Sequence, residues 1–161
     1  MKWLWTAVAL LLAFVLQSGL SLVVSGNGRL LDPFLLVVVY CGLTGGETHG
    51  MLAGAGAGWI QDVEFGGSVG GLSALTKLLL GFAVGMTATR FLLATPAARV
   101  LVLFAATLLD ALVFERLALV FEVPAAEVSL AGLVARSLIN ALVGGLAFYA
   151  IELRVRKEAR S

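Results

Sequence analysis

The stretch that decides the fold is residues 70–89, which read GGLSALTKLLLGFAVGMTAT. Lys77 is its only charged residue, and about twenty apolar residues in a helix are long enough to cross the hydrocarbon core of a membrane. Gly81 and Gly85 remove side-chain bulk from one helix face, so that another helix can approach closely. The stretch therefore predicts a membrane-spanning helix that packs tightly against a neighbour and buries one positive charge.

The rest of the chain repeats this apolar character. Of its 161 residues, 60% are hydrophobic and 13% are charged, which is about half the charged share of a soluble domain. This composition predicts an all-α integral membrane protein, a single domain over residues 1–161 with about six helices in one compact bundle. We expect spans at about 3–24, 33–45, 48–62, 70–89, 97–120 and 130–152.

The second and third predicted spans are short. They fall below the roughly 20 residues that a full crossing needs, so we expect a hairpin that crosses a thinned or shielded region, or one that partly re-enters. Asp32-Pro33 is a good helix start, because Asp can cap free amides and Pro fits the first turn.

Several functional classes find no support in the sequence. The lone Cys41 excludes an internal disulfide, and one histidine, His49, argues against a zinc or haem site. We find no catalytic motif such as Gly-x-Ser-x-Gly or His-Glu-x-x-His, and no phosphate loop. A net charge of +1 does not point to nucleic acid. We therefore expect no enzyme activity, no cofactor and no metal.

The basic residues predict the orientation. If both termini face the cytoplasm, that side holds seven of the eleven basic residues, and the other side holds Arg29 and Arg116. This is the positive-inside bias of membrane proteins. The seven are Lys2, Arg90, Arg99, Arg154, Arg156, Lys157 and Arg160. We expect an even number of crossings, with the last of these residues meeting anionic membrane lipid.

Small residues recur at helical spacing in three of the predicted spans. The third, fourth and first spans carry, in that order, Gly50, Gly54 and Gly58, then Gly81 and Gly85, then Ala9 and Ala13. Each set predicts a face for close helix packing, either inside the bundle or against a partner protein. The first span is expected to face outward, because it has no strongly polar residue in its core.

Ionisable and polar side chains inside the predicted spans mark a candidate site, since charges in a membrane normally face protein or water. The candidates are Asp62, Lys77, Asp110, Arg136 and Asn140. A depth count at about 1.5 Å per residue places the four charged ones in the outward half. Three interpretations stay open: an ion-pair network that fixes helix register, an outward pocket for a ligand or a partner's segment, and a proton or ion relay.

Residues 31–85 resemble the MreD family of bacterial rod shape-determining membrane proteins. The family has a proline-led short second helix, a glycine-rich third helix ending in Gly-x-x-x-Asp, and a fourth helix that starts near Gly-x-x-Ala-Leu. The matching stretches are LDPFLLVVVY at 31–40, GWIQD at 58–62 and GLSAL at 71–75, together with Gly54, Gly66, Gly70, Gly81 and Gly85. The turn reads VEF before Gly66, which is bulkier and more acidic than the family pattern.

The resemblance implies a non-enzymatic role in the cell-elongation machinery that makes peptidoglycan, in the bacterial inner membrane. It implies MreC, RodA and a class-B penicillin-binding protein as partners. It also implies a fold similar to the S-components of energy-coupling-factor transporters, which dock through the first helix; Ala9 and Ala13 suit such docking. The alternative is that the chain is itself an S-component-like subunit that binds a vitamin or other small molecule.

Overall fold

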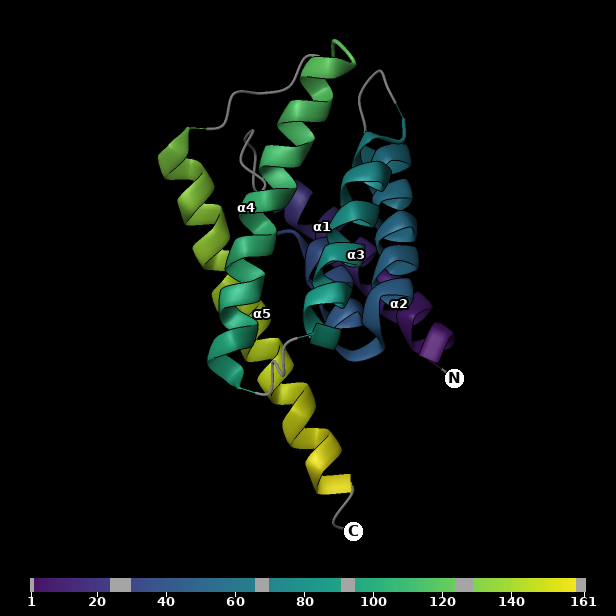
Figure 1. Cartoon of the computed structure of the whole chain (residues 1–161), viewed down its shortest axis with the longest axis vertical. Helices are drawn as coiled ribbons and strands as arrows, with labels where there is room; N and C mark the ends of the chain where they lie inside the picture. Colours follow the sequence, from purple (N-terminus) through teal and green to yellow (C-terminus); the bar gives the residue numbers. More distant parts are fainter. Residues whose placement is uncertain (1, 24–29, 66–69, 91–94, 124–128, 159–161) are drawn as a thin grey trace.

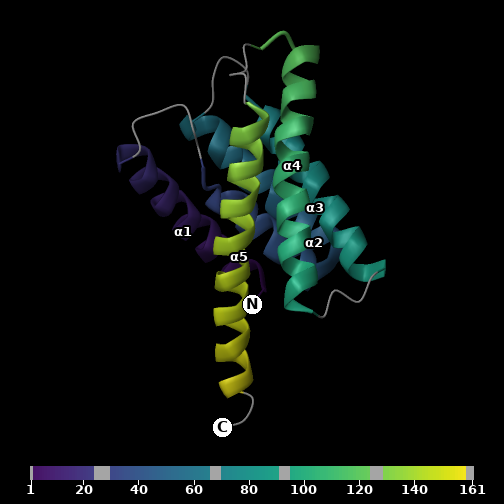
Figure 2. The same ribbon diagram turned by 90° about the vertical axis from the view of Figure 1, so that its left-hand side faces the viewer.

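A computed structural model describes residues 2–23, 30–65, 70–90, 95–123 and 129–158 as an all-helical bundle (Figure 1). Its helices are α1 (Lys2–Val23), α2 (Pro33–Phe65), α3 (Leu72–Arg90), α4 (Pro96–Val120) and α5 (Leu130–Glu158). Arg29, Gly66 and Arg160, on which some of the expectations above depend, lie outside the described residues. In Figures 1 and 2, α5 projects beyond the other helices at its C-terminal end.

The element α2 is a hairpin of two helical halves. Its backbone leaves the helical conformation at Gly46, where φ is 81° and ψ is −172°. Phe34 and Val38 of the first half share a buried cluster with Ala57 of the second half. In a straight helix Phe34 and Ala57 would lie about 35 Å apart, so the chain must reverse at Gly46. The positive φ explains why glycine occupies this position.

The expected count of six spans is not confirmed. Four helical segments are long and apolar enough to cross a membrane, namely Trp3–Ser21, Leu72–Arg90, Pro96–Val120 and Leu130–Arg154. Neither half of α2 is among them. The predicted spans 33–45 and 48–62 correspond to the two halves of α2. These halves do not count as spans because they are short and because the turn between them is polar, with Glu47 and His49.

Capping residues set several helix ends. Thr95 accepts a hydrogen bond from Ala98 N at 3.3 Å, and Pro96 follows as the first residue of α4. Ser129 Oγ accepts from Gly132 N at 3.1 Å at the start of α5. These side chains satisfy amides that the first helical turn leaves free. Polar residues therefore act locally, at the points where the apolar runs begin.

The second half of α2 packs against α3 with almost no space between the backbones. A Cβ atom added to Gly50 or Gly54 would overlap the backbone of Gly81 or Lys77, respectively. The same holds for Gly58 against Ala74, for Gly81 against Gly50, and for Gly85 against Glu47. All five predicted glycines therefore lie in one internal contact, so in this structure they are covered by their own chain.

Helix α1 lies against α2 and contacts no other helix in the described part of the chain. Figure 2 shows α1 slanting across the bundle, whereas α5 follows the long axis. Ala13 is buried in the cluster that contains Phe34, Val38 and Ala57. This corrects the expectation that Ala13 offers a docking face to a partner. Ala9 is half-buried.

The main apolar core joins the remaining helices. It contains Leu35 and Val39 of α2, Leu80 and Val84 of α3, Leu103 and Ala106 of α4, and Ala141 and Phe148 of α5. Each helix thus contributes a short stripe of buried residues to one centre. Large apolar side chains on the opposite faces are exposed, as expected of helices that face lipid.

The glycine contact leads to a prediction with an internal control. Gly54→Ala should destabilise the protein by about 1–3 kcal/mol, because the new Cβ meets a backbone that cannot move aside. Gly56→Ala, two residues away, meets only a side-chain atom of Leu10 at 3.6 Å, so this change should be neutral or stabilising through helix propensity. Thermal unfolding of both variants in detergent measures this. Equal midpoints would contradict the close contact.

Candidate functional site

A cluster of charged side chains lies at the centre of the bundle, and Lys77 is its middle. The Lys77 side chain is only 2% exposed. Its Nζ atom lies 2.9 Å from Asp32 Oδ2 and 3.2 Å from Asp110 Oδ1. Asp32 precedes α2, Lys77 belongs to α3 and Asp110 belongs to α4. One ammonium group therefore connects three helices.

Arg136 adds the second positive charge from α5. Its Nη2 atom lies 3.4 Å from Asp32 Oδ2 and 3.6 Å from Asp110 Oδ2. The Arg136 side chain is 19% exposed, and its Nε atom is buried without a hydrogen-bond partner in the described residues. Two positive and two negative groups thus form a neutral cluster, the condition under which buried charges are tolerated.

Asn140 completes the cluster one helical turn after Arg136. Its Oδ1 atom accepts a hydrogen bond from Asp32 N at 2.9 Å. Its Nδ2 group donates to Leu30 O at 3.3 Å and to Arg136 O at 2.9 Å. The amide therefore fixes the non-helical backbone just before α2, where a peptide group would otherwise lack a partner.

Asp32 is the residue with the most roles. Oδ1 caps α2 by accepting from Leu35 N at 3.0 Å, Oδ2 accepts from Lys77 and Arg136, and the backbone N–H donates to Asn140. The sequence alone indicates only the capping role of Asp32, through Asp32-Pro33. A depth count would have revealed more, because thirteen residues from Pro33 to Gly45 span only about 20 Å. A helix that short, with its turn at one membrane surface, would begin inside a hydrocarbon layer of about 30 Å.

The structure brings Lys77, Asp110, Arg136 and Asn140 together and places Asp62 elsewhere. The Asp62 carboxylate accepts hydrogen bonds from Gly71 N, Ser73 N and Ala74 N at 2.9–3.0 Å. It is the cap of α3, and it also holds the turn that precedes this helix. Grouping Asp62 with the charge cluster was therefore wrong, because three backbone amides already satisfy its carboxylate.

A smaller polar contact joins α1 to α2. Thr6 Oγ1 lies 2.8 Å from His49 Nε2, and the rings of Trp3 and His49 meet edge to face with centroids 4.8 Å apart. Through these contacts His49, at the turn of α2, holds the beginning of α1. Gln17 of α1 is also buried, so α1 does have polar residues on its inner face.

The charged groups described above are paired with one another or with backbone amides. In the described ranges there is no group of three or more His, Cys, Asp or Glu side chains that would hold a metal ion. The buried acidic and basic side chains among these residues are Asp32, Asp62, Lys77 and Asp110. They belong to the central cluster and the α3 cap. What this geometry provides is a set of paired charges that tie four segments of the bundle together.

The fold and this site define a class, that of helical membrane proteins whose buried charges are paired within the bundle. The family model of the rod shape-determining protein MreD matches residues 1–157. The chain therefore belongs to the MreD family, whose members determine rod shape and which is not a known enzyme family. No curated protein matches the chain. No solved structure matches it either, so the expected similarity to transporter S-components is not confirmed.

The charge cluster leads to a prediction about single and double changes. Lys77→Met should destabilise the protein by about 3–5 kcal/mol, because it leaves two buried carboxylates with a single guanidinium to pair with. Lys77→Met combined with Asp110→Asn should recover part of this loss, because Asp32 and Arg136 remain as a neutral pair. Thermal unfolding in detergent compares the two. A double variant no more stable than the single one would contradict the pairing.

Proposed function

We propose that the chain is a non-enzymatic membrane component of the bacterial cell-elongation machinery, where it binds and organises partner membrane proteins during peptidoglycan synthesis. Family membership supports the process, because the MreD family determines rod shape. The observation that carries the binding role is the exposed face of α1, a helix that packs on α2 alone among the described helices and leaves most of its large side chains uncovered. The partners proposed by the family resemblance are MreC, RodA and a class-B penicillin-binding protein.

The bundle supports this role as a rigid platform. Glycine contacts lock α2 to α3, and Lys77 and Arg136 tie the start of α2, α3, α4 and α5 to one point. We propose that the charge cluster fixes helix register, so that the outer faces keep a constant shape. A relay is less well supported, because the cluster is closed on itself and neutral.

The outer face of α1 is the proposed partner surface. Its exposed side chains are Leu4, Trp5, Val8, Leu11, Leu12, Val15 and Leu16. Such a surface suits the transmembrane helix of another protein as well as lipid. The polar contact between Thr6 and His49 holds α1 in place and so presents this face in a defined direction.

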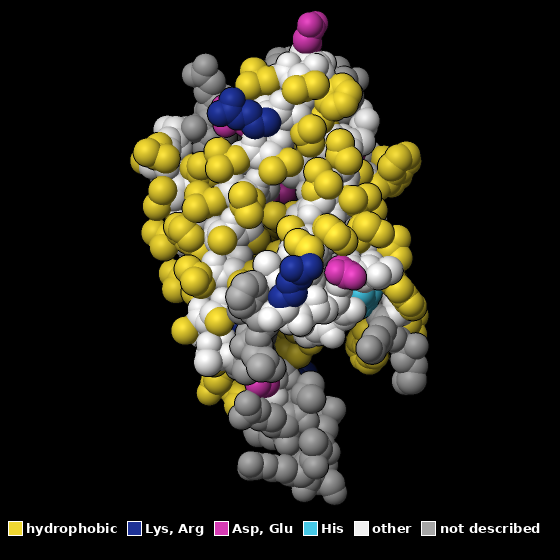
Figure 3. Space-filling view, viewed as in Figure 1, with side chains coloured by type: hydrophobic (Ala, Val, Ile, Leu, Met, Phe, Trp, Pro, Cys, Tyr) yellow, Lys and Arg dark blue, Asp and Glu magenta, His cyan; other side chains and the backbone are white. Residues whose placement is uncertain are grey.

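The proposed topology is multi-pass, with the two halves of α2 as a short hairpin and both termini in the cytoplasm. Figure 3 shows a belt of hydrophobic side chains between charged side chains near the two ends of the bundle. Arg99 and Glu152 form an ion pair of 2.9 Å between the start of α4 and the last part of α5. Arg90, Arg99 and Arg154 belong to the end that would face the cytoplasm.

Two pockets of the described residues give the vitamin-binding alternative no support. Their volumes are about 170 Å³ and 90 Å³. Ligand sites for small molecules usually measure about 300–1,000 Å³. The smaller pocket lies near Tyr40, Arg99 and Phe148. Neither pocket is lined by Lys77 or Asp110.

Mild detergent extraction followed by affinity purification tests the proposed function. MreC, RodA or a class-B penicillin-binding protein should co-purify with the chain. Leu4→Ala with Leu11→Ala should lower this recovery several-fold, because both exposed side chains lie on one face of α1. Leu142→Ala with Leu146→Ala, on the exposed face of α5, is the matched control and should not. Co-purification of a transport ATPase instead would overturn the proposal.

The topology has its own test. A reporter that fluoresces only in the cytoplasm, fused after Ser161, should be bright, because the positive-inside bias places the C-terminus there. The same reporter preceded by one additional spanning helix serves as the dark control. A dark fusion with full-length expression would reverse the proposed orientation.

A further inference from the structure

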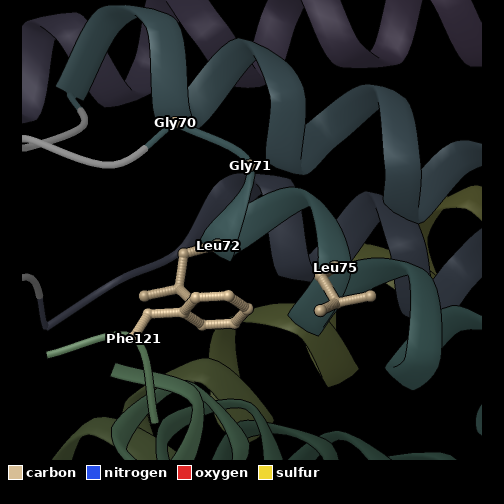
Figure 4. A pocket seen from close by; sticks show the side chains of 5 residues that line it. All are labelled: Gly70, Gly71, Leu72, Leu75 and Phe121. Carbon is tan, nitrogen blue, oxygen red and sulfur yellow. The ribbon is translucent and has the colours of Figure 1, made fainter. Parts of the chain in front are cut away.

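The two pockets described above differ in what lines them. The larger one lies between the start of α3 and the residue that follows α4 (Figure 4). Its lining residues are Gly70, Gly71, Leu72, Leu75 and Phe121. The smaller one lies between α2, α3, α4 and α5, and its lining residues are Tyr40, Leu43, Thr44, Ala88, Arg99 and Phe148. Of the two, only the smaller pocket is lined by a charged residue and by residues with hydroxyl groups.

Arg99 and Glu152 bring opposite charges to the smaller pocket. Arg99 lines it, and Arg99 Nη1 lies 2.9 Å from Glu152 Oε2. Both side chains are 28% exposed, so the pair is accessible from outside the bundle, in contrast to the central charge cluster. The pair has no net charge. The site therefore presents a group that binds anions and, directly beside it, a group that binds cations.

The remaining wall is apolar on one side and polar on the other. The rings of Tyr40 and Phe148 meet with their centroids 5.2 Å apart, and Phe148 is buried. Thr44 is exposed, and its hydroxyl donates to Tyr40 O at 2.8 Å. The Thr44 oxygen can still accept a hydrogen bond, and the Tyr40 phenol can donate one. A polar group that enters the pocket thus finds both donors and acceptors.

The pocket lies at one end of the apolar helices. Arg99 is among the first four residues of α4, Ala88 is among the last three of α3, and Thr44 lies two residues before the turn of α2. Glu152 lies two residues before the end of the apolar segment of α5. In the proposed multi-pass arrangement this is the boundary of the hydrocarbon layer, where phospholipid headgroups lie. Both membrane surfaces carry headgroups, so this placement does not depend on the orientation of the chain.

The size of the pocket fits a headgroup better than a whole ligand. Its volume of about 90 Å³ is smaller than the cavity of about 150 Å³ that accepts a benzene ring. A phospholipid needs to insert only its polar group, because its acyl chains stay in the bilayer. Arginine is well suited to phosphate, since its parallel N–H groups bind two oxygens at once. Basic pockets between spanning helices are typical sites for lipid headgroups.

Glu152 discriminates between kinds of headgroup. An anionic lipid would place a second negative charge beside this carboxylate, which is unfavourable where water is partly excluded. A phosphoethanolamine headgroup is zwitterionic, so its phosphate can pair with Arg99 while its ammonium pairs with Glu152. One ion pair is then exchanged for two, and no charge is left over. A choline headgroup is also zwitterionic, but its quaternary nitrogen has no N–H to donate to the carboxylate.

We propose that the pocket lined by Tyr40, Thr44, Arg99 and Phe148 binds the headgroup of one phosphatidylethanolamine molecule, with the phosphate on Arg99 and the ammonium on Glu152. The inference goes beyond the proposed function and rests only on the proposed crossing of the membrane by the long helices. The shared chemistry of the ligand is a phosphate joined to a primary amine, and the acyl chains make the lipid its source.

Native mass spectrometry of the full-length protein tests the site and its selectivity. Released from bilayers of equal parts phosphatidylethanolamine and phosphatidylglycerol, the chain should retain the first lipid several-fold more often than the second. Glu152→Gln should lower this ratio several-fold, because Arg99 then attracts an anionic lipid without opposition. Glu47→Gln, the same change at the exposed turn of α2, is the matched control and should leave the ratio unchanged. Equal retention of the two lipids, or equal ratios in the two variants, would overturn the proposal.

Two further variants test the pocket itself. Arg99→Gln should lower retention of phosphatidylethanolamine several-fold, and Ala88→Phe should do the same by filling the pocket while keeping the ion pair. Arg154→Gln, an exposed arginine at the same end of α5 that does not line the pocket, is the control. Thermal unfolding confirms that each variant folds. A folded Arg99→Gln or Ala88→Phe protein that retains the lipid normally would contradict the site.

A soluble competitor distinguishes a lipid from a free ligand. Phosphoethanolamine in the buffer has both charged groups and no acyl chains, so at millimolar concentration it should not displace the lipid. Displacement would show that the pocket selects a soluble molecule and would overturn the lipid assignment. Loss of lipid preference in a protein that still co-purifies with MreC would overturn this site and leave the proposed function standing.

Discussion

In the proposed topology the structure depends on one constraint, which is that a helix beginning inside the membrane leaves amide groups that water cannot reach. The first half of α2 begins at Pro33, about 20 Å from the turn at Gly46. Non-helical backbone at such a depth is tolerated only when protein covers it and satisfies its polar groups. Asp32 caps the helix, Asn140 binds the backbone on both sides of Leu31, and Lys77 and Arg136 neutralise the cap. The charge cluster is therefore the means by which an interrupted helix is accommodated.

Glycine packing provides the second half of the explanation. In lipid no hydrophobic force drives helices together, so close contact and buried polar groups decide which faces meet. The contact of Gly50, Gly54 and Gly58 with α3 brings Lys77 to its position, since Gly54 touches the backbone of Lys77 itself. The cluster and the glycine contact therefore stabilise the same arrangement. The apolar faces that remain outside are free to meet lipid or partner helices.

Most members of the charge cluster could be predicted from the sequence, and the exceptions have physical reasons. Lys77, Asp110, Arg136 and Asn140 were recognisable because polar residues interrupt long apolar runs. Asp32 was read only as a cap, because its depth depends on where the chain turns at Gly46. Asp62 looked equivalent to the other charges, but its partners are backbone amides, which leave no mark in the sequence.

The packing faces show a similar limit. The spacing of Ala9 and Ala13 indicates a helix face of small residues, but it does not say whether that face points toward the bundle or away from it. The structure turns it toward Phe34 and Val38. The pocket beside Phe121 was also missed, because it joins a loop near Gly70 to the end of a helix fifty residues later, and no local pattern connects them.

The central claim is that Lys77 is paired with two buried aspartates, and solid-state NMR in lipid tests it most directly. The chain has three lysines and three aspartates, and Lys2 and Lys157 lie near the termini. With ¹⁵N in lysine and ¹³C in the aspartate carboxyl groups, the Lys77 ammonium should show strong dipolar coupling to carboxyl carbon. This follows because Lys77 Nζ lies 2.9 Å from an oxygen of Asp32 and 3.2 Å from an oxygen of Asp110. The signal should vanish in Lys77→Met. A Lys77 ammonium with no aspartate oxygen within about 4 Å, the limit for an ion pair, would contradict the account.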